Sequence, residues 1–164
     1  MNIKPPNRIA RSYIQRLVAP PSEVFPLLCP VREADWIEGW APRQVLSESG
    51  LAEPNCVFTT AEGDSEAVWV ITRHDPGVCA VEMVRVAPGV TVCRLTIEVV
   101  PHGDGSAATV TYRHTSLGPA GDQLVGSFTE DYYRGFMEEW ERRLNHYLST
   151  GRMLVSAETS GAAS

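Results

Sequence analysis

No apolar run in the 164-residue sequence approaches the roughly 18–20 residues that a membrane-spanning helix requires. Residues 1–11 carry charge, and no apolar segment follows them as it would in a secretory signal. We therefore expect no stable membrane insertion and a cytoplasmic location.

Basic residues are outnumbered and dispersed. The chain has 14 Lys and Arg against 20 Asp and Glu, a net charge of −6. A surface that binds nucleic acid needs a basic stripe. The arginines that could supply one are scattered, namely Arg8, Arg11, Arg16, Arg73, Arg85, Arg94 and Arg113. We therefore expect no nucleic-acid partner.

The cysteines and histidines are widely and irregularly spaced, which favours buried free thiols over a redox or metal role. The four cysteines (Cys29, Cys56, Cys79 and Cys93) form no Cys-x-x-Cys pair, and the four histidines add no zinc-type spacing. Glycine-rich phosphate loops, Gly-x-Ser-x-Gly turns and carboxylate-rich metal loops are also missing. The sequence predicts free, buried thiols, no metal and no cofactor.

A long amphipathic segment, residues 121–148, is the strongest local pattern in the chain. Its period is near 3.6 residues, which predicts one long C-terminal helix. One arc of the helical wheel carries Val125, Thr129, Tyr133, Phe136, Trp140, Leu144 and Tyr147. Charged residues occupy the opposite side. We expect residues 1–150 to form a single domain and the small, polar residues 151–164 to form a flexible tail.

Strand-like segments joined by turn residues precede this helix. A strand is expected over residues 8–18, followed by two short helices, residues 22–28 with Ser22 as the N-cap and residues 31–36. Further strands are expected near residues 43–47, 56–61, 66–73, 79–87, 91–100 and 107–115. Short turns make neighbouring strands antiparallel. The predicted fold class is α+β, a curved antiparallel sheet of six to seven strands wrapped around the long helix.

Several segments resemble one known family. Residues 21–25 (Pro-Ser-Glu-Val-Phe) resemble the turn into its first short helix, and residues 33–40 (Glu-Ala-Asp-Trp-Ile-Glu-Gly-Trp) resemble its tryptophan-bearing stretch. Residues 57–60, 68–72 and 110–118 resemble its middle and final strands. From about residue 8 to residue 148 the chain is similar to the START-like (SRPBCC) superfamily, which includes birch-pollen-allergen proteins, polyketide cyclases and lipid-transfer domains. The resemblance implies a helix-grip fold with a cavity, and it transfers no catalytic residues because the family has no universal active-site motif.

The last predicted strand offers two candidate catalytic residues. Val110, Tyr112 and His114 alternate with more polar neighbours, so we expect them to face inward. A neutral imidazole can act as a general acid or base, and a phenol can polarise a carbonyl group. The alternative is that both side chains are buried with ordinary hydrogen-bond partners.

Candidate ligand-binding residues come from all parts of the fold. Aromatic rings supply the apolar area of a typical cavity. Glu82 and Arg94 form either an outward ion pair or an inward anchor for a polar group. The full candidate set is Trp36, Trp40, Phe58, Trp69, Glu82, Arg94, Tyr112, His114, Tyr133, Phe136 and Met137.

Three functions are compatible with these features. We favour binding of a hydrophobic or aromatic small molecule between the sheet and the C-terminal helix, by a monomer or a homodimer. The alternative is a cyclase- or hydratase-type enzyme that uses acid–base residues in the same cavity. A protein-interaction module is a third possibility, but the contiguous exposed apolar patch that it needs is not evident.

Overall fold

The computed structural model describes residues 1–156 of the chain, and its seven strands form one sheet with all helices on one face. In chain order the elements are β1 (Arg8–Leu17), α1 (Pro21–Val24), η1 (Phe25–Leu27), η2 (Arg32–Asp35), β2 (Gln44–Leu46), β3 (Val57–Glu62), β4 (Ser65–Asp75), β5 (Ala80–Ala87), β6 (Thr91–His102), β7 (Gly105–Ser116), α2 (Pro119–Ser127) and α3 (Glu130–Thr150). This arrangement confirms the predicted α+β helix-grip fold.

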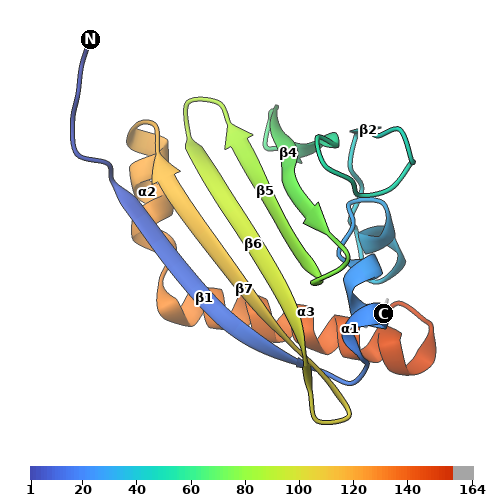
Figure 1. The fold of residues 1–164 in the computed structure, drawn as a ribbon. Helices are drawn as coiled ribbons and strands as arrows, with labels where there is room; N and C mark the ends of the chain where they lie inside the picture. Colours follow the sequence, from blue (N-terminus) through green and yellow to red (C-terminus); the bar gives the residue numbers. More distant parts are fainter. Residues whose placement is uncertain (157–164) are drawn as a thin grey trace, which may run out of the picture.

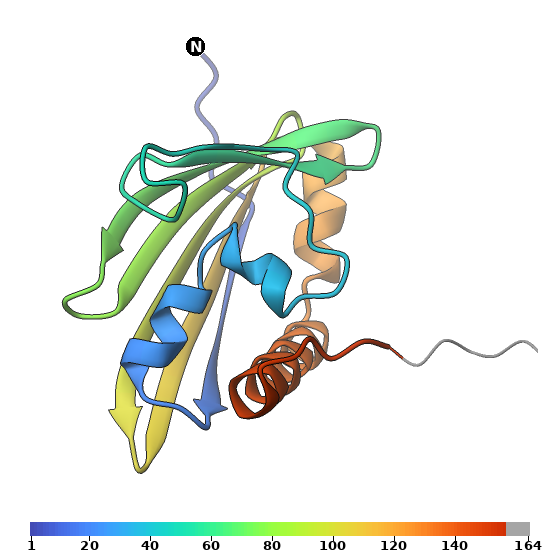
Figure 2. The same ribbon diagram turned by 90° about the vertical axis from the view of Figure 1, so that its right-hand side faces the viewer.

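The sheet is antiparallel throughout and has the strand order β1-β7-β6-β5-β4-β3-β2. Strands β2 to β7 follow one another as a meander; short turns join β3 to β7, and the longer segment 47–56 joins β2 to β3. β1 lies beside β7, so the first and last strands are neighbours (Figure 1). The sheet curves around the helices, and α3 lies across its lower part, above the hairpin between β6 and β7 (Figures 1 and 2).

Alternation along the strands determines which side chains face the helices. On β7, Val110 and His114 are buried, whereas Arg113 between them is exposed. β6 follows the same rule, with Cys93 and Leu95 buried on the concave face. Successive side chains of a strand point to opposite faces of the sheet. The pairing register of a strand therefore determines which of its side chains face the helices.

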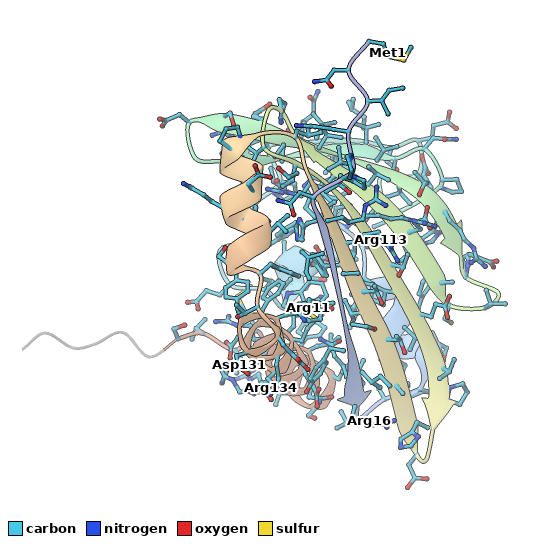
Figure 3. All side chains as sticks on the ribbon, turned by 90° about the vertical axis from the view of Figure 1, so that its left-hand side faces the viewer. Met1, Arg11, Arg16, Arg113, Asp131 and Arg134 are labelled. Carbon is cyan, nitrogen blue, oxygen red and sulfur yellow. The ribbon has the colours of Figure 1, made fainter. Side chains whose placement is uncertain are left out.

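The C-terminal region contains two helices, so the expectation of one long helix over residues 121–148 is wrong. α2 ends at Ser127, and Thr129 has extended backbone before α3 begins. The Thr129 Oγ1 accepts a hydrogen bond from the backbone N–H of Tyr132 at 3.2 Å, a normal N-cap. Arg11 on the edge strand β1 donates to the backbone carbonyl of Phe128 at 3.2 Å (Figure 3). The two helices run in clearly different directions (Figures 1 and 2).

Gly121 holds α2 close to the turn between β5 and β6. A Cβ atom at this position would lie 2.0 Å from the backbone carbonyl oxygen of Val90. The same oxygen accepts a hydrogen bond from the backbone N–H of Leu117 at 2.8 Å. Any larger residue at position 121 would therefore displace α2 from the sheet.

Two further expectations concern the cap of the first short helix and the C-terminal tail. The first short helix begins at Pro21 with Pro20 as its N-cap, so Ser22 is not the cap. Proline at the first helical position is favoured because its missing N–H would have no partner there. Residues 157–164 of the expected tail lie outside the described residues. Just before them, Ser156 donates a hydrogen bond from its hydroxyl group to Glu38 at 2.8 Å.

Candidate ligand-binding site

A cavity of about 430 Å³ lies between the concave face of the sheet and the helices. The sheet contributes Phe58, Trp69, Met83, Arg85, Cys93, Leu95, Tyr112 and His114. The segment around η2 contributes Pro30, Glu33, Ile37 and Trp40, and the helical side contributes Leu124, Ser127, Phe128, Tyr132, Phe136 and Trp140. Ser127 and Tyr132 are exposed, so the rim of the cavity lies where α2 meets α3.

Aromatic rings form most of the cavity wall. Phe58 stacks on Trp69 with ring centroids 5.3 Å apart, and Trp40 packs edge-on against Phe58. Across the cavity, Phe136 lies 5.9 Å from Tyr112 and 6.1 Å from Trp140. Such rings bury large apolar areas and hold one another in defined orientations. The wall is therefore suited to a flat apolar molecule.

Tyr112 and His114 lie side by side on β7, with ring centroids 6.1 Å apart. The Nδ1 atom of His114 is buried without a hydrogen-bond partner in residues 1–156. Burial, and then the charge of Arg85, lowers the pKa of His114 to about 4. Burial also raises the pKa of Tyr112 well above its ordinary value. Both side chains are consequently uncharged at neutral pH.

One ion pair lies at the sheet side of the cavity. Arg85 donates to the carboxylate of Glu62, and its guanidinium lies 5.6 Å from the ring centroid of Trp69. The pair is mostly withdrawn from solvent, because the Arg85 side chain is 14% exposed. The positive charge of Arg85 thus already has a protein carboxylate and an aromatic ring as partners.

Glu33 is a cavity residue that the sequence analysis did not identify. It is 7% exposed, and burial alone raises the pKa of its carboxyl group to about 8. Sequence patterns predict solvent exposure for a glutamate in a short polar segment. The only available signal was the spacing of Glu33 from Trp36 and Trp40, which matches one face of a helical turn.

The structure brings six of the sequence-predicted residues together at the cavity. These are Trp40, Phe58, Trp69, Tyr112, His114 and Phe136. They come from the loop before β2, from strands β3, β4 and β7, and from helix α3. The alternation on β7 and the apolar arc of the helix therefore selected side chains that share one space.

Three other aromatic or apolar candidates lie in the packed core and not at the cavity. Trp36 is fully buried and donates from its indole N–H to the backbone carbonyl of Leu27 at 3.1 Å. Tyr133 and Met137 are buried in α3 against the sheet. Large apolar residues on an inner face fill the core as readily as they line a cavity, so periodicity does not separate the two roles.

Glu82 and Arg94 lie on the outer face of the sheet, away from the cavity. They alternate with the inward-facing Met83 and Leu95, and Arg94 donates directly to the Glu82 carboxylate. Arg94 is the main cause of the lowered pKa of Glu82. The structure thus places the outward ion pair, one of the two arrangements that the sequence left open.

The remaining polar groups give no sign of a metal centre. Residues 1–156 contain no group of three or more His, Cys, Asp or Glu side chains positioned to hold a metal ion. Cys93 forms part of the cavity wall, where burial raises the pKa of its thiol to about 12. At that pKa the thiol is protonated at neutral pH and acts as a small apolar group.

The break between α2 and α3 supplies cavity residues that a single long helix would not have predicted. Leu124, Ser127, Phe128 and Tyr132 all belong to this region. Phe128 packs edge-on against His114 with ring centroids 4.6 Å apart. Thr129 followed by Glu130 and Asp131 is an N-cap pattern, and it was the sequence signal for a new helix start.

Comparison with known proteins identifies the fold. No family model matches the sequence, and no curated protein matches it. Among solved structures, norcoclaurine synthase from Thalictrum flavum is similar at a TM-score of 0.65 and 12% identity, with 88% of each chain covered. Ara h 8.0201 is similar at a TM-score of 0.60 and 14% identity, covering 87% of this chain and 99% of that one.

DynU16, a protein of the dynemicin biosynthetic locus, is similar at a TM-score of 0.56 and 17% identity. The match covers 90% of this chain and 49% of DynU16, so the chain spans about half of that protein. These identities are low, and the likeness therefore concerns architecture. The chain has the helix-grip fold that its resemblance to the START-like superfamily predicted.

Proposed function

We propose that the protein binds a hydrophobic or aromatic small molecule in the cavity between the sheet and helices α2 and α3. The observation that carries this proposal is the 430 Å³ cavity walled by aromatic side chains from both layers. Ligand sites are typically concave, mostly apolar and of a few hundred cubic ångströms, with a small number of polar groups. Glu33, Tyr112 and His114 supply such polar groups here.

Native mass spectrometry of the purified protein tests this function. A bound molecule adds mass that disappears on denaturation, and its fragmentation identifies the ligand class. The substitution Cys93→Phe places a ring in the cavity, so the added mass should be lost. Thr96→Phe on the outer face of the same strand is the matched control and should keep it. Equal ligand content in the two variants would contradict binding in the cavity.

Acid–base catalysis in the same cavity is a second candidate, favoured by the contact between Tyr112 and His114. General acid–base catalysis is most effective when the pKa lies near the working pH. The pKa of His114, about 4, makes its imidazole a weak base in the empty cavity. NMR titration of His114 with the natural ligand bound tests this role. A pKa raised towards 7 would support catalysis, and a value that stays near 4 favours binding alone.

We also propose that the protein is cytoplasmic, acts as a monomer or homodimer, and has no nucleic-acid partner. The net charge of −6 supports the last point. Within residues 1–156, no helix has the length and apolar character needed to cross a bilayer. Light scattering coupled to size-exclusion chromatography tests the oligomeric state, and a trimer or larger assembly would contradict the proposal.

A further inference from the structure

Glu33 presents a carboxyl group to the cavity without a partner from the protein. It lines the cavity and is only 7% exposed. Within residues 1–156 its carboxyl group makes no ion pair or hydrogen bond, and burial is the one cause of its altered pKa. Buried polar groups nearly always have a hydrogen-bond partner. An unpartnered carboxyl at a cavity wall therefore indicates that a partner comes from the cavity.

The backbone around Glu33 is held firmly. Its N–H donates to the Cys29 carbonyl at 2.8 Å, and its own carbonyl accepts from the N–H of Ile37 at 2.8 Å. The indole of Trp40 donates to the backbone carbonyl of Pro30 at 2.7 Å. These bonds hold the segment from Cys29 to Trp40 in one conformation, so the backbone position from which the Glu33 side chain extends is set before any ligand arrives.

The other titratable groups at the cavity leave Glu33 without a charge partner. They are Arg85 on β5, Cys93 on β6, Tyr112 and His114 on β7, and Tyr132 on α3. Arg85 is paired with Glu62 and does not affect the pKa of Glu33. A carboxyl with a pKa of about 8 is protonated at pH 7. The cavity therefore presents a neutral acid, a neutral imidazole and a neutral phenol.

We propose that Glu33 selects the ligand of this cavity by donating a hydrogen bond from its carboxyl group to an oxygen acceptor on an uncharged aromatic molecule. This inference rests on the proposed binding function and names the ligand class. The rings of Trp40, Phe136 and Trp140 line the same cavity, with Phe136 packed against Trp140, and bind the apolar part of that molecule. A ketone, quinone or similar carbonyl compound has the required chemistry.

An uncharged ligand fits better than a cationic one. Moving an ion from water into an apolar cavity is costly unless a counter-ion is already present, and a cation would first have to remove the proton from Glu33. The guanidinium of Arg85 in the same wall repels a second positive charge. A neutral carbonyl oxygen meets a donor that is already in place and needs no change of protonation.

Three compounds with one carbon skeleton test this selection. 2-Acetylnaphthalene carries the acceptor oxygen, 2-ethylnaphthalene lacks it, and 1-(2-naphthyl)ethylamine is a cation at neutral pH. Affinities are measured by equilibrium dialysis at pH 6.5 for the wild type, Glu33→Gln and Glu33→Leu. The readout is the ratio of ketone affinity to hydrocarbon affinity in each protein, because a ratio compared between variants cancels the different water solubilities of the probes.

Glu33→Leu should shift this ratio against the ketone by about tenfold, which is the effect of one hydrogen bond. Glu33→Gln keeps an N–H donor and should stay within about twofold of the wild type. Glu23→Gln on α1, outside the cavity, is the matched control and should leave every affinity unchanged. In the wild type the ratio should also fall above about pH 8, where Glu33 loses its proton.

Three outcomes overturn the inference, and they differ in what they leave standing. If ketone and hydrocarbon bind but their ratio is the same in the wild type and Glu33→Leu, the cavity function stands and the role of Glu33 is refuted. If the amine binds most tightly and Glu33→Gln abolishes its binding, the cavity function also stands. The hydrogen-bond role proposed for Glu33 is then refuted, because the site recognises a cation. If neither the ketone nor the hydrocarbon binds the wild type, the proposed function and the inference both fail.

Discussion

Tyr133 on α3 donates a hydrogen bond from its hydroxyl group to the backbone carbonyl of Val110 on β7 at 2.5 Å. Both residues are buried, and the bond joins the long helix to the middle of strand β7. Burial raises the pKa of Tyr133, so the phenol remains a donor at all ordinary pH values. Tyr133 thus has a structural role, because it ties α3 to β7.

Tyr133→Phe should lower the free energy of unfolding by about 1–2 kcal/mol, because the Val110 carbonyl loses its buried donor. The cavity wall is unchanged, so the affinity for 2-acetylnaphthalene should stay within twofold of the wild type. Urea denaturation and equilibrium dialysis measure the two quantities. A large loss of affinity at unchanged stability would show that Tyr133 contacts the ligand.

Phe136→Ala and Met137→Ala should lower the free energy of unfolding by different amounts, although the two residues are adjacent. Met137 is fully buried, and its truncation leaves a void in packed core at a cost of about 2–5 kcal/mol. Phe136 borders the existing cavity, so its truncation should cost less than that of Met137, well under the ~3–5 kcal/mol of a fully packed phenylalanine, and should mainly weaken ligand binding. Urea denaturation of both variants checks the order. A greater loss for Phe136→Ala would contradict the position of the cavity.

His114 should make the protein less stable as the pH falls from 6.5 to 4. The unfolded chain binds a proton at His114 in this window, whereas the folded chain, with a pKa of about 4, does not. His114→Phe should remove a decrease on the order of 3 kcal/mol between pH 7 and pH 4. Urea denaturation across this range gives the slope of the free energy of unfolding against pH. An identical slope in the variant would mean that His114 is not buried as described.

Glu33 should make the protein less stable as the pH rises, which is the opposite of the effect of His114. Its pKa is raised to about 8, so the folded chain holds a proton that the unfolded chain has released above about pH 4.5. The free energy of unfolding should therefore fall as the pH rises from 4.5 to 8. Glu33→Gln should remove this fall and be more stable than the wild type at pH 9, by on the order of 5 kcal/mol. A wild type whose stability is independent of pH above 5 would contradict the buried carboxyl.

Much of the fold follows from local patterns. Alternation along β7 predicted that Val110, Tyr112 and His114 share one face, and turn residues predicted the antiparallel order of the strands. The two-helix C-terminus was missed because Val125 and Thr129 continue the apolar arc across the break. Helical periodicity records which face is apolar, but it does not record a change of axis between two helices.

The site was predictable only in part, for a physical reason. Whether Trp36 fills the core while Trp40 lines the cavity depends on how several elements meet in space, which one segment does not encode. Glu33 was missed because charged residues are seldom buried, and it lines a cavity built from segments that lie far apart in the sequence. Sites of this kind depart from sequence rules because function requires polar groups inside apolar walls.

The central claim is that the cavity holds a small aromatic molecule, and NMR mapping of a bound probe tests it most directly. We predict that 2-acetylnaphthalene shifts the resonances of Tyr112, His114 and Phe136 and gives intermolecular NOEs to their rings. Residues on the outer face, such as Glu82 and Arg94, should not respond. Shifts confined to the outer face, or no shifts at saturating probe, would contradict the claim.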